Sequence, residues 1–164
     1  SGRFTEGFSL RRSQSEPEIS NYVKTFFEQD LSRRGIIVNR EVEIHGPEGL
    51  GKTDVHIDAV SKGTRPGQFE RLKAVIELKG CWHQEVRSAM KDQLLDQYLS
   101  SADCRDGIFL VAWFDPQRWD PADYRRDRVP KWTLEEAREF FRTQAETNSG
   151  PDRLVRAFVL DCSF

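Results

Sequence analysis

Hydrophobic positions at regular spacing divide the chain into short elements from residue 15 onward. Ser15 and Glu18 have the spacing of a capping box, and Pro17 falls in the first turn that follows. Apolar residues then recur at helical intervals, at Ile19, Val23, Phe26, Phe27 and Leu31. The pattern predicts a helix that ends before Gly35.

Three strands are predicted next, separated by loops that contain glycine and proline. Residues 36–44 are rich in isoleucine and valine, and residues 54–60 alternate polar and apolar side chains. A third apolar segment, residues 72–78, is followed by Gly80. The connecting loops are residues 45–52 and 63–67.

The second half predicts a helix, a strand, a helix and a strand. The first helix carries its apolar face at Val86, Ala89, Met90, Leu94 and Tyr98. Residues 107–114 form a continuous apolar run, typical of a strand buried on both faces. After a long connection, Thr133 and Glu136 have capping-box spacing, and residues 156–160 predict the last strand.

This order predicts an α/β fold with a mixed central sheet flanked by helices. The core order is αβββαβ, followed by a C-terminal helix and strand. A length of 164 residues fits one domain, which we expect to span residues 15–164. Residues 1–14 lack periodicity and are expected to be a flexible arm or a tag or linker remnant, because Ser1-Gly2 resembles the product of tag removal. We therefore expect a domain of a longer protein.

Composition narrows the class of protein. No apolar run approaches the roughly 20 residues that span a bilayer, so no membrane association is expected. Cys81, Cys104 and Cys162 are odd in number and far apart, which favours a reducing cytoplasm over a disulfide framework. The three histidines are scattered, which argues against a structural zinc site.

Net charge gives no general attraction for nucleic acid, because 25 Lys and Arg face 27 Asp and Glu. The basic residues are locally concentrated, however, at Arg125, Arg126, Arg128 and Lys131. This segment is flanked by Trp119 and Trp132. We expect these tryptophans to pack in the core, with base stacking as the lesser alternative.

Residues 46–53 match the phosphate-loop pattern GxxxxGK[ST]. That mechanism requires a helix to begin at Lys52, so that its amides face the phosphates. The residues that follow alternate like a strand instead. The glycines are therefore interpreted as a hairpin loop, and nucleotide binding is the less favoured alternative.

Acidic residues and a lysine gather on two neighbouring predicted strands. Asp54 and Asp58 share one face of the first strand, and Glu77 and Lys79 share one face of the second. Antiparallel pairing would bring an aspartate next to Glu77. Two half-buried carboxylates repel unless a divalent cation lies between them, and a nearby lysine can orient a water molecule.

These residues and the element order around them resemble the PD-(D/E)xK nuclease superfamily, over about residues 15–114. The resemblance implies a restriction-endonuclease-like fold in which Asp54, or alternatively Asp58, and Glu77 bind the metal. The backbone carbonyl of Leu78 would add a ligand, and Lys79 would be the catalytic lysine. Asp54 is preferred because it directly follows a loop, where a metal stays accessible.

Two further residues enter through the same resemblance. Many family members add a glutamate from the first helix, which here would be Glu18, although Glu18 also fits a plain cap partner of Ser15. Some members place a glutamine and a tyrosine four apart on the second helix, where this chain has Gln93 and Tyr98 five apart. Residues 79–82 and this helix also look like nuclease-type domains at the C-termini of large bacterial proteins, some of them linked to defence.

The implied function is phosphodiester hydrolysis in nucleic acid, DNA rather than RNA, with Mg²⁺ or Mn²⁺ as the cofactor. Hard divalent ions suit the oxygen ligands, and a bound metal lowers the pKa of its water. Other domains of the parent chain would supply targeting. The main alternative is a nuclease-like fold that binds no metal and serves as a nucleic-acid-binding or assembly module.

Overall fold

The computed structural model describes residues 15–31, 36–40, 43–46, 49–52, 55–62, 69–100 and 104–163. Its helices include α1 (Glu16–Leu31), the π-helix η2 (Met90–Leu99), the 3₁₀-helix η3 (Tyr124–Arg128) and α2 (Leu134–Asn148). Its strands are β1 (Ile36–Arg40), β2 (Glu43–Gly46), β3 (Gly49–Lys52), β4 (Val55–Lys62), β5 (Phe69–Gly80), β6 (Asp106–Trp113) and β7 (Leu154–Asp161).

A five-stranded mixed sheet organises the fold, in the order β1-β4-β5-β6-β7. β4 pairs antiparallel with both β1 and β5, whereas β5, β6 and β7 run parallel. The carboxyl ends of these three parallel strands therefore lie at one edge of the sheet. The predicted α/β class and mixed sheet are confirmed.

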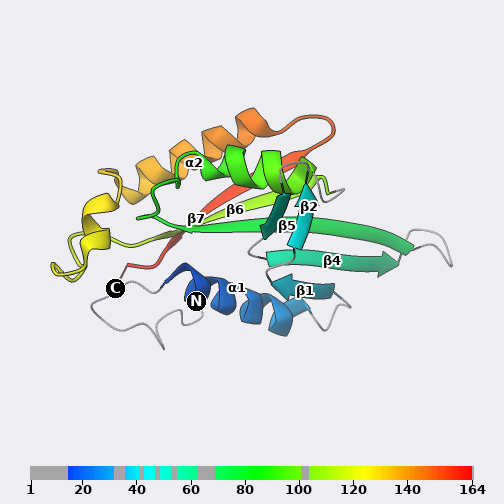
Figure 1. The fold of residues 1–164 in the computed structure, drawn as a ribbon, viewed down its shortest axis with the longest axis horizontal. Coiled ribbons are helices and arrows are strands. Elements are labelled where there is room, and N and C mark those ends of the chain that lie inside the picture. The colour runs from blue at the N-terminus through cyan, green and yellow to red at the C-terminus, as the bar shows by residue number, and fades with distance from the viewer. Residues whose placement is uncertain are drawn as a thin grey trace.

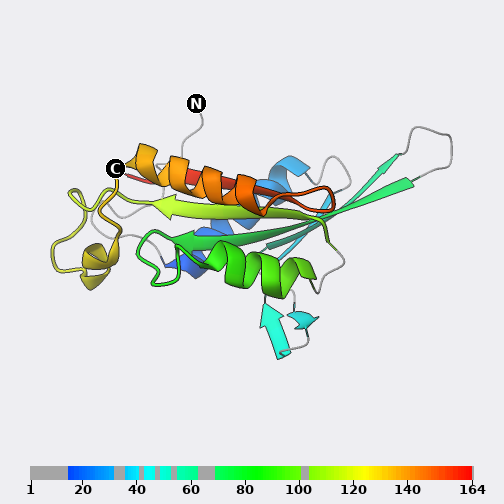
Figure 2. The same cartoon turned by 90° about the horizontal axis from the view of Figure 1, so that it is seen from above.

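Helices cover the two faces of the sheet. Figures 1 and 2 show α1 on one side and η2 with α2 on the other. Packing against β6 agrees: a Cβ added at Gly107 would lie 2.8 Å from Leu99 of η2, and the Phe109 ring lies 5.6 Å from the Phe141 ring of α2. Residues two apart on a strand share a face, so Gly107 and Phe109 both mark the side covered by η2 and α2.

Aromatic packing closes the carboxyl-end edge of the sheet. Trp82, which follows β5, has its ring 5.6 Å from Phe114 and 5.4 Å from Trp119. All three side chains are buried. They join the segments after β5 and β6 in a single apolar cluster, which holds the long connection from residue 115 onward against the sheet.

The predicted elements are largely confirmed, with two differences. Residues 36–44 are not one strand: β1 ends at Arg40, and β2 pairs with β3 in a separate two-stranded hairpin. Lys52 is the last residue of β3 and Val55 already begins β4, so among the described residues no helix starts at the phosphate-loop lysine. The hairpin interpretation of residues 46–53 is supported.

The second difference concerns the helix after β5. Residues 84–88 form turns, and the regular helix begins only at Met90 and is a π-helix. The capping box at Thr133 and Glu136 is present as predicted. Residues 1–14 lie outside the described residues. In the part of the chain that is described, no helix has both the length and the apolar character needed to cross a membrane.

Candidate active site

Glu77 and Lys79 lie on β5, the middle strand of the sheet. Glu77 is in register with Phe109 and Lys79 with Val111 of the parallel neighbour β6. Paired residues of adjacent strands point to the same face. Both side chains therefore point to the face covered by η2 and α2, near the edge where the parallel strands end.

The two side chains form a buried ion pair. Lys79 Nζ lies 2.6 Å from Glu77 Oε1, and the side chains are only 10% and 2% exposed. Burial of either charge alone would carry a large desolvation penalty, which the opposite charge offsets. The predicted proximity of Glu77 and Lys79 is thus observed, in a setting largely shielded from solvent.

The two aspartate candidates differ in what the structure says of them. Asp54 lies outside the described residues. Asp58 is within β4, where it is in register with Lys73. Lys73 precedes Glu77 by four residues, about 13 Å along a strand. Asp58 is therefore displaced from Glu77 along the strand direction by this distance, which disfavours it as a ligand to the same metal.

Glu18 lies in the cap of α1. The backbone N and the Oγ of Ser15 both donate to Glu18 Oε2 at 2.7 Å, and these bonds lower the pKa of Glu18. Glu18 is exposed, and α1 covers the sheet face opposite to that of Glu77. The geometry favours the cap function over metal binding.

Another glutamate of α1, which the sequence did not single out, reaches the end of β5. The backbone N of Gly80 donates to Glu16 Oε1 at 2.8 Å, and Glu16 Oε2 lies 4.0 Å from His83 Nε2. The only sequence signal for Glu16 was its acidic character in the first turn of a helix. Glu16 fixes the start of α1 to the chain just beyond Lys79.

Gln93 lies in η2, and its Nε2 donates to Glu85 Oε2 at 2.8 Å. Hydrogen bonds of a π-helix join residues five apart, so residues at that spacing share a face. Gln93 and Tyr98 therefore lie closer to one side of η2 than they would in an α-helix, where residues five apart point about 140° away from each other. Tyr98 is 6% exposed and packs in the core as predicted.

A network around Asp123 fixes the arginine-rich segment against the sheet. Asp123 Oδ2 accepts a hydrogen bond from Trp119 Nε1 at 3.1 Å and one from Arg125 Nη2 at 2.6 Å. The Arg125 guanidinium lies 5.2 Å from the centre of the Trp82 ring. Hydrogen bonds from Arg125, followed by that from Trp119, lower the pKa of Asp123 to about 2 despite its burial.

The two tryptophans that flank this segment are engaged in packing. Trp119 is 4% exposed and bonded to Asp123. Trp132 is partly buried, with its ring 4.7 Å from that of Phe140 and with Arg87 over it at 4.6 Å. The expectation that they belong to the core is met, and the base-stacking alternative loses support for Trp119 in particular.

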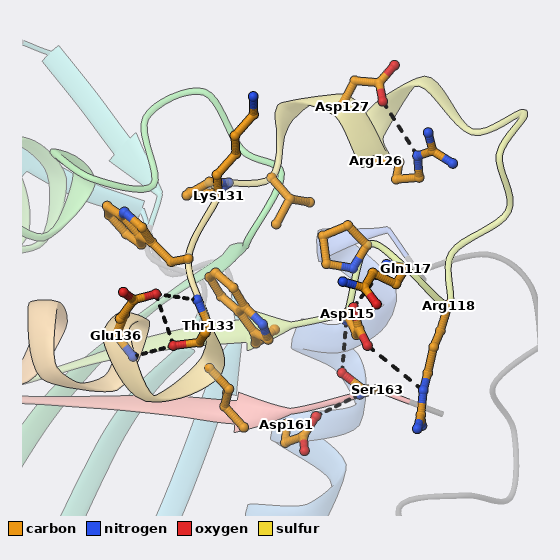
Figure 3. A pocket seen from close by; sticks show the side chains of 16 residues that line it. Asp115, Gln117, Arg118, Arg126, Asp127, Lys131, Thr133, Glu136, Asp161 and Ser163 are labelled. Carbon is orange, nitrogen blue, oxygen red and sulfur yellow. Dashed lines mark hydrogen bonds and ion pairs between the residues drawn. The ribbon is translucent and has the colours of Figure 1, made fainter.

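A hollow of about 870 Å³ lies at the carboxyl ends of β6 and β7 (Figure 3). Its charged groups are largely paired with each other: Arg118 with Asp115 at 3.9 Å and Arg126 with Asp127 at 3.5 Å. Its seven charged lining residues are four acids and three bases, namely Asp115, Asp127, Glu136, Asp161, Arg118, Arg126 and Lys131. This charge balance gives the hollow little attraction for an anion.

Burial keeps the thiol that follows β5 unreactive. Cys81 is fully buried, and this burial raises the pKa of its thiol to about 12. A thiolate is the reactive form of cysteine. Cys81 is therefore a small packing residue, and its burial disfavours a role as a nucleophile.

Comparison with known proteins gives a family but no activity. A family model described as a domain of unknown function (DUF8371) matches residues 4–116. No curated protein and no solved structure matches the chain. The matched region contains Glu77 and Lys79 and ends just after β6, so η3, α2 and β7 lie beyond it.

Proposed function

We propose that this chain, which belongs to the DUF8371 family, is a divalent-metal-dependent nuclease domain that hydrolyses phosphodiester bonds, in DNA rather than RNA. The observation that carries the proposal is the Glu77–Lys79 pair, with 2.6 Å between charged atoms at the end of the central strand. The carboxylate can hold a hard divalent ion, and the ammonium group beside it can stabilise the negative charge that develops on a phosphate.

The arrangement of elements supports a restriction-endonuclease-like architecture. Within the five-stranded sheet the chain order is helix, three strands, helix, strand, and then helix and strand, with the β2–β3 hairpin inserted after β1. The π-helix gives Gln93 and Tyr98 a common face, which is compatible with the glutamine–tyrosine pair of some PD-(D/E)xK nucleases. Both features are consistent with the resemblance on which the proposal draws.

The donor atoms at this position suit Mg²⁺ or Mn²⁺. Glu77 supplies a hard carboxylate, and the Leu78 carbonyl is adjacent to it in the chain. Among the described residues no three His, Cys, Asp or Glu side chains are grouped to hold a metal, so the second carboxylate has to come from elsewhere. Mg²⁺ commonly binds through one or two carboxylates and retains several waters.

Asp54 is the residue we assign as that second carboxylate. It is covalently joined to Val55, which is in register with Ile76, the residue before Glu77. Val55 thus marks the end of β4 that is nearest to Glu77, and Asp54 is the residue that precedes it in the sequence. No comparable argument applies to Asp58, because it is opposite Lys73.

The roles of the residues follow from the charges. A bound metal would lower the pKa of a coordinated water and offset negative charge on the phosphate. Lys79 orients that water and stabilises the charge that develops on the phosphate oxygens. A new bond forms between water oxygen and phosphorus, the opposite P–O bond breaks, and the leaving oxygen takes up a proton.

The test is cleavage of fluorescently labelled DNA in Mn²⁺, with Lys79→Ala compared with Lys91→Ala. Lys91 is an exposed lysine of η2 and serves as the control. We expect Lys79→Ala to lose roughly 100-fold or more in rate and Lys91→Ala to keep its rate. Undiminished cleavage by Lys79→Ala, or no metal-dependent cleavage by the parent chain, would overturn the proposal.

The ion pair requires a second variant in this test. Lys79→Ala leaves Glu77 buried without the opposite charge seen here, a change that typically destabilises a protein by about 3–5 kcal/mol. A loss of cleavage by Lys79→Ala therefore needs a control for loss of the fold. Glu77→Gln combined with Lys79→Met removes both charges together, and we expect this double variant to fold and to cleave no DNA.

The same ion pair favours one alternative function. Because Lys79 already neutralises Glu77, the pair is also compatible with a fold that needs no metal and only binds nucleic acid. Such a module would bind DNA equally well in EDTA and in Mn²⁺ and would cleave none. The cleavage assay distinguishes the two functions.

A further inference from the structure

We propose that the exposed ring of Tyr124, together with Arg128 and the hollow beside them, binds the unpaired bases of single-stranded nucleic acid. We call this surface the Tyr124 platform. The inference rests on the proposed function and narrows its substrate to single strands. The Tyr124 platform lies outside the region matched by the family model, which ends at residue 116.

Exposure of a large ring is the first observation. Tyr124 is 67% exposed, more than any other large hydrophobic residue that the structure describes. The Arg128 guanidinium lies 4.9 Å from the centre of the Tyr124 ring. The guanidinium lies over one face of the ring, so a base would stack on the opposite face, with the arginine charge available to the adjoining phosphate.

A hollow of about 450 Å³ adjoins the ring. It is lined by Trp82, His83, Gln84, Glu85, Tyr124, Arg125 and Arg128. This volume lies in the range of small-ligand sites, about 300–1,000 Å³. Two arginines and one glutamate line it, and that glutamate, Glu85, accepts a hydrogen bond from Gln93. Because Arg125 is already paired with Asp123 at 2.6 Å, Arg128 is the lining residue that we assign to the phosphate.

The platform is held rigidly. Asp123 caps η3 by accepting a hydrogen bond from the backbone N of Arg125 at 3.1 Å, and it also binds Trp119. Arg125 in turn lies over the Trp82 ring. A surface that is already ordered loses little conformational entropy when a ligand binds. The exposed Tyr124 is therefore presented by a buried framework.

Position links the platform to the proposed active site. Trp82 and His83 line the hollow and follow Lys79 by three and four residues. Three residues span at most about 11 Å. Glu16 holds Gly80 and lies near His83, which fixes this part of the chain relative to β5. A base bound at Tyr124 would thus place its phosphates within a few nucleotides of Glu77 and Lys79.

Single strands fit this chemistry better than duplexes. In a duplex the base faces are covered by neighbouring pairs, so an aromatic ring cannot stack on them without unstacking the helix. In a single strand the faces are available, and base–aromatic stacking is largely independent of sequence. With a net charge of −2, the chain has little general attraction for the dense charge of a duplex.

The test measures the dissociation constant of a fluorescein-labelled oligo-dT strand by anisotropy, in EDTA so that no cleavage occurs. We expect Tyr124→Ala to weaken binding about tenfold and Tyr124→Phe to stay within about twofold, because the ring is retained. Phe158→Ala is the matched control, since Phe158 is an exposed ring on β7. It should leave binding unchanged.

Arg128 is tested through the salt dependence of the same binding. Removing one phosphate contact lowers the slope of log K against log salt by about 0.7 for a single strand. We expect this change in Arg128→Ala and none in Arg156→Ala, which removes an exposed arginine of β7. The dissociation constants of Tyr124→Ala and of the parent chain for a hairpin duplex should agree within about twofold.

The outcomes separate this inference from the nuclease proposal. Three outcomes would overturn the platform, whatever the cleavage assay gives. Tyr124→Ala could bind oligo-dT as tightly as the parent chain, it could lose as much affinity for the duplex as for oligo-dT, or the parent chain could fail to bind oligo-dT. Tyr124-dependent binding without metal-dependent cleavage would support the platform and overturn the nuclease assignment.

Discussion

A single buried carboxylate, Asp123, determines the local order of the arginine-rich segment. Its side chain is 6% exposed and is hydrogen-bonded to Arg125 and Trp119. These bonds favour the charged form and hold the pKa of Asp123 at about 2, below its ordinary value of 3.8. A carboxylate with a lowered pKa stabilises the folded state above its unfolded-state pKa and loses that contribution as pH falls toward the folded-state pKa.

We therefore predict that Asp123→Asn lowers the free energy of unfolding by about 2 kcal/mol at pH 7. The difference from the parent chain should shrink as pH falls from about 4 toward 2, because the parent Asp123 then becomes protonated. Urea denaturation between pH 3 and pH 7 measures this. Asp127→Asn, at a carboxylate that is 80% exposed, should change stability by less than about 0.5 kcal/mol. A difference that stays constant with pH would contradict the prediction.

Residue-level prediction from sequence worked where local geometry is sufficient. Glu77 and Lys79 are two apart on a strand, so their common face followed from alternation alone. Glu16 and Asp123 were not recognised, because their partners Gly80 and Trp119 are identified only by the folded backbone. The preference for Asp54 over Asp58 rested only on its place after a loop, since the strand register is not contained in the alternation.

At the scale of elements, strands with β-branched residues and capped helices were predictable, and elements defined by packing were not. β3 consists of Gly49–Lys52, a sequence with low strand propensity that pairs only because β2 lies beside it. The π-helical hydrogen bonds of η2 also have no signature in the apolar spacing, which fits an α-helix equally well.

The end of β5 shows how an element is joined to its neighbours. A Cβ added at Gly80 would lie 2.5 Å from Cε2 and Cη2 of the Trp82 ring, which is itself buried against Phe114 and Trp119. We predict that Gly80→Ala destabilises the fold by about 1–3 kcal/mol, because a rigid ring has to move.

Gly150→Ala provides the control for this prediction, since nothing lies within 4 Å of a Cβ at that position. Its effect on the urea midpoint should be neutral or slightly stabilising. Equal urea midpoints for the two alanine variants would contradict the prediction, because they would show that the Trp82 ring moves without loss of stability.

At the scale of the molecule, the sheet order brings chemistry together from distant parts of the sequence. Because β5, β6 and β7 are parallel, the segment after Lys79 and the connection after β6 share one edge. Both the Glu77–Lys79 pair and the Tyr124 platform adjoin that edge. The sequence predicted the elements, but it did not predict that the arginine-rich connection would pack next to Trp82.

Metal binding should be visible in the stability of the whole domain. A ligand that binds only the folded state stabilises it by about 2.7 kcal/mol at 100 times its dissociation constant. For a protein of this length we predict that Mn²⁺ at that concentration raises Tm by roughly 5–10 °C. Differential scanning calorimetry with and without Mn²⁺ measures the rise.

Variants of the two aspartates locate the metal within the sheet. We expect Asp54→Asn to lose most of the rise and Asp58→Asn to keep it, because Asp58 is opposite Lys73, four residues from Glu77. Asp115→Asn, in the hollow of Figure 3, should also keep it. A rise that survives Asp54→Asn but is lost with Asp58→Asn or Asp115→Asn would move the metal away from Glu77. In that case Lys79 would lie too far from the metal-bound water to orient it, and the ion pair would be a feature of packing alone.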